Sequence, residues 1–212
     1  MAEIRESHIR EPLLKPVAIK NLRPTQITLG MREVRERRRQ WRREVSKKKW
    51  NGFLEQHLIP AILGPGGAHY ILDHHHLTRA LQEEGVEHLY VTITDDLSEL
   101  DPESFWYVLD QRNWIHPFDQ KGKRVSYRRI PKSVDRMLDD PYRSLAGELR
   151  RAGGFAKDAA PFSEFLWADF LRRRIKPKMA RDEFRQALKL ALKMAKSKEA
   201  NYLPGWSGPV DN

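Results

Sequence analysis

The chain has 212 residues, of which 40% are hydrophobic, which suffices for one sizeable core or a compact domain with a smaller appendage. It contains no cysteine, which excludes disulfides, thiolate metal sites and a cysteine nucleophile. The formal net charge of +10 favours polyanionic partners such as nucleic acid or phosphorylated ligands. The first residues lack the apolar segment of a signal peptide and no run is long enough to span a bilayer, so we expect a cytoplasmic protein without membrane contact.

Two segments hold most of the positive charge. Residues 31–49 contain ten Lys or Arg against three Asp or Glu, a net of +7, and residues 172–198 contain eleven against two, a net of +9. Such segments are either solvated helix faces or surfaces that bind a polyanion, and the sequence leaves both readings open.

The first part of the chain is expected to alternate strands and helices. Residues 16–26 indicate a short strand followed by a turn, and residues 28–45 indicate a helix capped by Thr28. In this helix Val34, Trp41 and Val45 share one narrow face, and the other faces are densely basic.

A hairpin, a helix and a further strand follow. Residues 57–73 read as two extended runs joined by "GPGG", and residues 74–85 as a helix that stops at Gly85. Residues 86–97 predict a strand whose blurred alternation is typical of two covered faces. The next helix starts at Asp101 as its cap.

From about Pro131 the pattern changes to helices separated by short breaks. The expected segments are 133–140, 141–153, 161–175 and 179–198. The tail should be ordered only where Tyr202 and Trp206 dock.

The chain therefore divides into three expected parts. They are an α/β domain over residues 12–120, a helical module over residues 130–200 and a tail over residues 201–212.

Three consecutive histidines, His74 to His76, follow Asp73 at the junction of a strand and a helix. Neighbouring positions on a helix point about 100° apart, so the three rings cannot converge on one ion. Asp73 and His76 have the i, i+3 spacing of a two-ligand site that takes a third ligand from elsewhere.

The same stretch also suits a phosphate site. Backbone N–H groups that follow Asp73 would be unpaired at the start of the helix and would attract an anion. Histidines there can donate to phosphate or act as general acid or base, and Asp73 can hold a divalent metal or accept a proton. Arg79 can clamp a phosphate or form a salt bridge. In the alternative reading Asp73 only caps the helix, one histidine packs on the sheet and the others face water.

At "LDHHHLTRAL" the sequence resembles the ParB/sulfiredoxin superfamily, in particular its branch of ParB-like nucleases, whose members carry a "DGHHR"-like box opening a helix. The upstream "LRPTQITLGMREV" resembles the branch's first conserved box, and "DDPYRSLAGELRRAGGF" and "PFSEFLWADFLRRRI" resemble its helical C-terminal half. The resemblance covers roughly residues 15–175. It implies an α+β fold, with a small mixed β-sheet and flanking helices followed by a helical module, and a nucleotide phosphate at the start of the box helix.

The resemblance also implies roles for single residues. Asp73, His75 and His76 match the Asp-His-His of the box and are the expected catalytic residues, with Asp73 as a possible Mg²⁺ ligand. The expected phosphate or nucleotide contacts are His74, His75, His76, Thr78, Arg79 and Gln26.

Several positions depart from the family pattern. His74 stands where the box has glycine, and Leu77 stands where it has arginine. The superfamily's free-serine kinases have a glutamate after the proline of the first box, and the nearest matching position here is Gln26. The side-chain amide of glutamine cannot act as a general base. The absence of cysteine excludes sulfiredoxin-like reductase chemistry.

Three functions remain open at this point. The first is an enzyme, a phosphodiester hydrolase of the ParB-like nuclease type or a nucleotide-dependent phosphotransferase, with Mg²⁺ and ATP or ADP as expected cofactors. The second is a module that binds nucleotide or nucleic acid without turnover. The third is a structural or interaction protein that keeps the fold with an inactive site.

Overall fold

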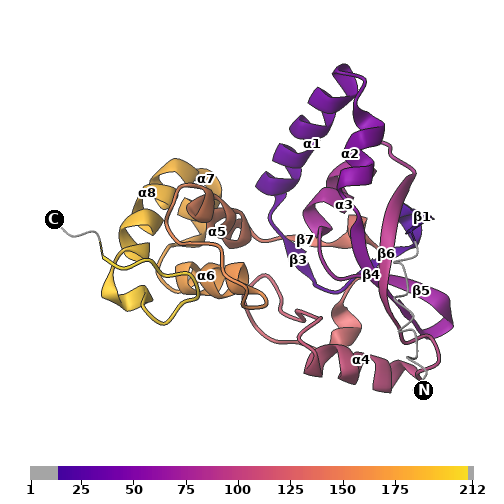
Figure 1. The fold of residues 1–212 in the computed structure, drawn as a ribbon. Coiled ribbons are helices and arrows are strands. Elements are labelled where there is room, and N and C mark those ends of the chain that lie inside the picture. The colour runs from indigo at the N-terminus through magenta and orange to yellow at the C-terminus, as the bar shows by residue number, and fades with distance from the viewer. Residues whose placement is uncertain (1–13, 210–212) are drawn as a thin grey trace, which may run out of the picture.

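Two lobes form the molecule (Figure 1), and the computed structural model describes residues 14–209. Residues 14–139, the sheet lobe, carry the β-sheet and α1–α4, and residues 140–209, the helical lobe, carry α5–α8. Residues 12–13 of the expected first domain and residues 210–212 of the expected tail lie outside the described residues.

A five-stranded mixed sheet organises the sheet lobe, with the order β1-β6-β4-β5-β2. Its strands are β1 (Leu14–Ala18), β2 (Leu22–Pro24), β4 (Ile59–Gly64), β5 (Ala68–Ile71) and β6 (His88–Asp96). β4 pairs antiparallel with β5 and parallel with β6, while β2 pairs parallel with β5 and β1 antiparallel with β6. The predicted hairpin is confirmed, because Gly66 and Gly67 turn the chain with φ of 69° and 73°. The predicted α+β class with a mixed sheet is also confirmed.

Four helices belong to this lobe: α1 (Met31–Ser46), α2 (Trp50–Gln56), α3 (His75–Glu83) and α4 (Pro102–Gln111). The expected cap at Thr28 is wrong, because Thr28 lies in the short strand β3 (Thr28–Leu29), which pairs with β7 (Leu138–Asp139), and α1 starts after Gly30. On the predicted apolar face, Val34 and Trp41 are buried but Val45 is exposed.

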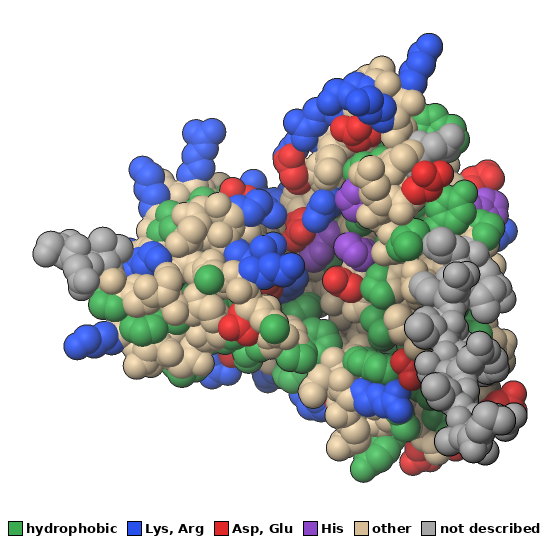
Figure 2. All heavy atoms as spheres, viewed as in Figure 1, with side chains coloured by type: hydrophobic (Ala, Val, Ile, Leu, Met, Phe, Trp, Pro, Cys, Tyr) green, Lys and Arg blue, Asp and Glu red, His purple; other side chains and the backbone are tan. Residues whose placement is uncertain are grey.

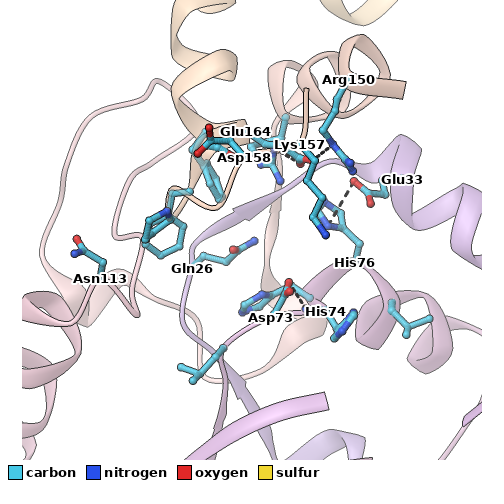
Figure 3. A pocket seen from close by; sticks show the side chains of 18 of the residues that line it. Gln26, Glu33, Asp73, His74, His76, Asn113, Arg150, Lys157, Asp158 and Glu164 are labelled. Carbon is cyan, nitrogen blue, oxygen red and sulfur yellow. Dashed lines mark hydrogen bonds and ion pairs between the residues drawn. The ribbon is translucent and has the colours of Figure 1, made fainter. Parts of the chain in front are cut away.

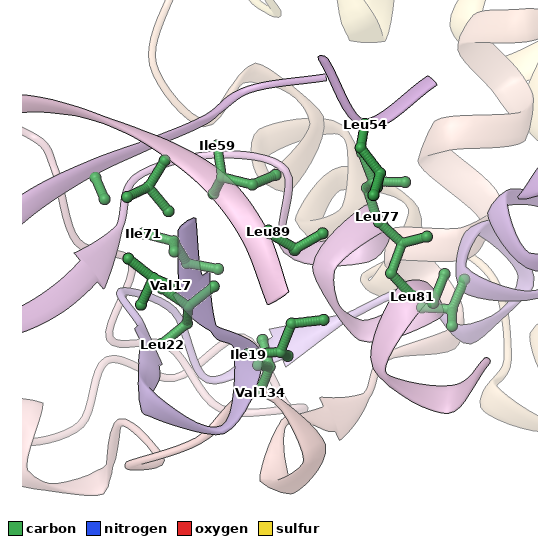
Figure 4. Close-up of a cluster of buried hydrophobic side chains, with 14 of the residues drawn as sticks. Val17, Ile19, Leu22, Leu54, Ile59, Ile71, Leu77, Leu81, Leu89 and Val134 are labelled. Carbon is green, nitrogen blue, oxygen red and sulfur yellow. The ribbon is translucent and has the colours of Figure 1, made fainter. Parts of the chain in front are cut away.

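The sheet lobe has a hydrophobic cluster on each side of the sheet. One contains Leu22, Ile59 and Ile71 of the sheet together with Leu77 and Leu81 of α3 (Figure 4). The other packs Ile62 and Tyr70 against Phe105 and Leu109 of α4. These two layers fix where β5 ends and α3 begins.

The strand β6 is covered less completely than its sequence indicates. Leu89 and Val91 are buried, whereas His88 and Tyr90 are exposed. The prediction of two covered faces is therefore wrong for this half of the strand, because no helix of residues 14–209 buries the side chains of its other face.

The helical lobe contains α5 (Pro141–Arg151), α6 (Ser163–Arg172), α7 (Pro177–Asp182) and α8 (Phe184–Ala195). The expected helix over residues 133–140 is wrong: the segment forms a single 3-10 turn and then β7. The backbone N–H of Leu138 donates to the Ile27 carbonyl (3.0 Å), so pairing with the sheet lobe overrides the local preference.

The C-terminal segment packs against this lobe. The Trp167 indole donates to the Pro204 carbonyl (2.8 Å), Leu203 is buried, and Trp206 packs against the cluster. Docking therefore involves Trp206, whereas Tyr202 remains 68% exposed. No helix in residues 14–209 is long and apolar enough to cross a membrane.

Candidate functional site

A cavity of about 500 Å³ lies between the two lobes, where the space-filling view shows a hollow containing histidines with arginine and lysine side chains around it (Figure 2). The start of α3, the Gln26 segment and α1 form its wall in the sheet lobe. The other wall comes from α5, residues 157–162 and the start of α6. The site is therefore built by both lobes.

The chain enters α3 through an unusual backbone conformation. His74 precedes the helix with φ 62° and ψ 23°, the left-handed region that glycine adopts at little cost. Glycine, which stands at this position in the box that the sequence resembles, would adopt this conformation without the strain that His74 bears. The Asp73 carboxylate accepts from the His74 N–H (2.6 Å), so Asp73 does not cap the helix.

This geometry leaves three backbone N–H groups without a partner in residues 14–209. The first helical hydrogen bond of α3 joins the Thr78 N–H to the His74 carbonyl (2.8 Å). The N–H groups of His75, His76 and Leu77 find no acceptor among the described residues, and all three residues line the cavity. Unpaired N–H groups at a helix start favour an anion through hydrogen bonds and the helix dipole.

His75 is a buried and neutral acceptor. Its Nε2 accepts from the Thr25 backbone N–H (3.2 Å), and only 4% of the residue is exposed. Burial, with the neighbouring positive charges adding to it, lowers the pKa of His75 to about 3. The ring therefore carries no charge near neutral pH, and its Nε2 is already engaged.

His76 makes a similar contact. Its Nε2 accepts from the Gly30 N–H (3.0 Å), while its Nδ1 lies 3.7 Å from a Glu33 carboxylate oxygen. Burial lowers the pKa of His76, against the opposing effect of Glu33. The two box histidines thus hold both ends of the segment from Thr25 to Gly30, which presents Gln26 to the cavity.

The helical lobe contributes a charged wall. Glu164 binds Arg143 (3.0 Å) and Arg150 (2.7 Å), and although burial raises its pKa, these two guanidinium groups bring it below its usual value. Arg143 is buried, and its Nε has no hydrogen-bond partner in the described structure. The exposed Lys157 extends into the cavity toward His76 (Figure 3).

Charges of both signs face the cavity. The cations are Arg37, Arg143, Arg150 and Lys157, and the carboxylates are Glu33, Asp73, Asp158 and Glu164. Arg143 and Arg150 are occupied by Glu164, whereas Lys157 forms no ion pair within the described part of the chain.

Backbone strain concentrates around the same cavity. Four non-glycine residues among those described have positive φ, and His74 (62°), Asn113 (55°) and Phe162 (57°) all line it. The fourth, Lys48, lies beyond α1. Conformations of this kind cost about 1–3 kcal/mol each and cluster at functional sites.

The structure brings together most, but not all, of the residues predicted to form the site. Asp73, the three histidines and Gln26 line the cavity, but Thr78 and Arg79 do not. Thr78 is fully buried. Arg79 donates to Glu83 (2.7 Å) and to the Val134 carbonyl (3.0 Å), so it forms a salt bridge and lies outside the lining of the cavity.

Sequence reasoning missed the residues from the helical lobe. Arg143, Arg150, Lys157 and Glu164 lie far downstream of the box, and no spacing rule connects them to it. The only signal was the resemblance of residues 139–155 and 161–175 to the family's C-terminal half.

The carboxylates do not build a dedicated metal cage. Among residues 14–209 no group of three or more His, Asp or Glu side chains converges on a common point. Asp73, exposed at the cavity, suits Mg²⁺ bound mainly by ligand phosphates, since protein Mg²⁺ sites often supply only one or two carboxylates.

The two basic segments differ in how their charges are used. On α1, Arg38 and Arg42 bind Glu84, and Arg39 and Arg43 bind Glu36. In the second segment Arg172, Arg173 and Arg174 form ion pairs with Asp140, Asp169 and Glu199. The exposed lysines of α8 form no ion pairs within the described structure. The second segment therefore has more free positive charge for a polyanion.

Comparison with known proteins gives a family and a solved structure. The sequence model of the family described as "Putative ParB-like nuclease" matches residues 15–173. The crystal structure of protein Atu1540 from Agrobacterium tumefaciens is similar at 48% sequence identity, covering 93% of this chain and 99% of that chain, with a TM-score of 0.85. No curated protein matches the chain.

Proposed function

This chain belongs to the family described as "Putative ParB-like nuclease", and from this membership we propose that it binds nucleotide or nucleic-acid phosphate in the inter-lobe cavity and acts there on a phosphoester or phosphoanhydride. The observation that carries the proposal is that His75, His76 and Leu77 line this cavity while their N–H groups have no acceptor among the described residues. Membership in this family supports the proposed reaction class, and these N–H groups support the proposed position of the phosphate.

Several features support a phosphate ligand at this point. Backbone N–H groups at a helix start bind phosphate without any charged side chain. Arg37 and Lys157 line the same cavity and can neutralise further oxygens. A volume of about 500 Å³ is in the range of sites that enclose a nucleotide-sized ligand.

Asp73 is the residue we propose as general base. Its carboxylate is exposed at the cavity directly before the unpaired N–H groups. It would accept the proton of water or of an attacking hydroxyl as that oxygen bonds to phosphorus, while the bond from phosphorus to the leaving oxygen breaks. A divalent cation bound to the phosphates would stabilise the negative charge that remains on the leaving oxygen.

The second candidate function is binding without turnover, and the hydrogen bonds and lowered pKa values of the two box histidines support it. Both box histidines use Nε2 to accept from backbone N–H groups, and burial lowers the pKa of each. Neither ring is then a ready proton donor at neutral pH, which leaves Asp73 as the main acid–base group. We therefore propose His75 and His76 as positioning residues in either case.

Binding and turnover should be measured on the same variants. We expect wild-type protein with Mg²⁺ to bind ADP or ATP by calorimetry, and Asp73→Asn to keep binding while turnover of ATP or DNA falls about 100-fold or more. Asparagine can still accept from the His74 N–H, so the fold should persist. Lys157→Ala should weaken binding about tenfold, and Lys178→Ala, which also removes an exposed lysine, should not.

The outcomes separate the candidates. Binding without turnover in the wild type would select the binding module. Absence of binding at millimolar nucleotide, or equal affinities of the Lys157 and Lys178 variants, would contradict the proposed site.

A further inference from the structure

A second hollow, of about 390 Å³, lies in the sheet lobe between the start of α4, strands β2 and β5, and residues 127–132. No residue lines both this hollow and the inter-lobe cavity. We call it the aromatic groove, and its side chains used below are Arg23, Tyr70, Trp106, Tyr127, Arg128 and Lys132.

The charge of the aromatic groove has one sign. Arg23, Arg128 and Lys132 line it, and none of its described lining residues is acidic. Arg128 and Lys132 are exposed and form no ion pair within residues 14–209, and Arg23 donates to the Tyr70 hydroxyl (3.0 Å) instead of a carboxylate. The inter-lobe cavity, by contrast, has four carboxylates among its lining residues. An anion is therefore the complementary ligand for the groove.

The walls between these cations are aromatic. Trp106 and Tyr127 stack with ring centroids 5.4 Å apart and planes at 18°, and Tyr70 meets Trp106 edge-on at 5.5 Å and 87°. Trp106 and Tyr127 both remain partly exposed. Partly exposed, fixed aromatic rings are the platforms on which unpaired bases stack.

We propose that the aromatic groove binds single-stranded nucleic acid, with an unpaired base against Trp106 or Tyr127 and the adjoining phosphates on Arg128 and Lys132. Base stacking explains why the walls of the groove are aromatic, and phosphate contact explains why the groove has basic but no acidic side chains among its described lining residues. A duplex does not satisfy the groove, because its bases are already stacked on one another. The inference does not depend on the inter-lobe cavity.

The test compares strands of equal charge with and without bases. Fluorescence anisotropy would measure the affinity of the full chain for oligothymidine of about twelve nucleotides and for an abasic strand of the same length. We expect the abasic strand to bind about tenfold or more weakly, since one stacked base contributes a factor of that order. Equal affinities would overturn the proposal, because charge alone would then explain binding.

Variants locate the contact. Arg128→Ala with Lys132→Ala should weaken oligothymidine binding about tenfold or more, whereas Lys121→Ala with Lys123→Ala, which removes two exposed cations outside the groove, should leave it unchanged. Equal losses in the two double variants would also overturn the proposal.

Tryptophan fluorescence reports directly on contact between a base and Trp106, and a purely structural role of Trp106 would not produce this signal. Bound oligothymidine should quench the wild-type emission, and in Trp106→Phe the quenching should shrink while anisotropy still reports binding. Unchanged quenching in Trp106→Phe would place the base elsewhere. Asp73→Asn should bind oligothymidine normally, so failure of the proposed activity and failure of this groove remain distinguishable.

Discussion

Replacing His75 by alanine should destabilise the protein, because this ring holds the buried Thr25 backbone. The substitution leaves the buried Thr25 N–H without its hydrogen-bond acceptor, which costs about 1–3 kcal/mol. Loss of a fully packed side chain of this size adds about 2 kcal/mol. We therefore expect the free energy of unfolding to fall by about 3–5 kcal/mol in total.

Urea unfolding followed by tryptophan fluorescence measures this loss. His75→Gln is the matched control, since the glutamine oxygen can occupy the place of the imidazole Nε2 and accept from Thr25 N–H. It should retain most of the stability, with a loss of about 1 kcal/mol. Equal loss in both variants, or an unchanged midpoint in His75→Ala with loss of nucleotide binding, would refute the positioning role and favour direct ligand contact.

Three further predictions concern other features. The pKa values of His75 and of His116, whose ring stacks on that of Phe118, are both lowered to about 3, mainly by burial. Between pH 6.5 and pH 3 the unfolded chain therefore binds more protons than the folded chain, so stability should be full above pH 6.5 and should fall by several kcal/mol toward pH 3. Urea midpoints that do not change with pH over this window would contradict this prediction. His74→Gly should leave nucleotide affinity unchanged and change the free energy of unfolding by less than about 1 kcal/mol, while His74→Ala keeps the left-handed strain and should not gain stability. A large loss of nucleotide affinity in His74→Gly would show that the His74 side chain contacts the nucleotide directly. The basic segments at residues 31–49 and 172–198 should bind duplex DNA, and the logarithm of the binding constant should fall with the logarithm of the salt concentration at a slope near −4.5 if about five phosphates are neutralised. A binding constant that does not change with salt would identify both segments as solvated faces.

Local patterns predicted much of the sheet lobe. The glycine turn between β4 and β5, the helix that ends before Gly85 and the helix capped by Asp101 all depend on residues within a few positions of each other. Such signals are readable because backbone sterics and capping act locally.

Predictions failed where distant contacts decide the structure. The segment 133–140 pairs with β3 and does not form a helix, and α1 begins only after Gly30 because Thr28 and Leu29 are held in that pair. Gly30 itself lies close to Ser144 of the helical lobe. A Cβ at Gly30 would lie 2.7 Å from the Ser144 backbone nitrogen, and the sequence gives no sign of that approach.

The candidate site was predictable only in its sheet-lobe half. The box identified Asp73 and the histidines, but the left-handed conformation of His74 and the engagement of both His75 and His76 with backbone N–H groups emerge only in three dimensions. The wall containing Arg143 and Glu164 depends on how the two lobes meet, which no periodicity encodes.

The most direct test of the phosphate site observes its backbone N–H groups. Titration of isotopically labelled protein with Mg²⁺-ADP, followed by amide NMR, should shift the N–H resonances of His75, His76 and Leu77 most strongly and with one common affinity, because these groups would donate to the phosphate oxygens. Inorganic pyrophosphate should shift the same three resonances. Saturating shifts confined to other regions, with these three N–H resonances unmoved, would contradict the proposed site.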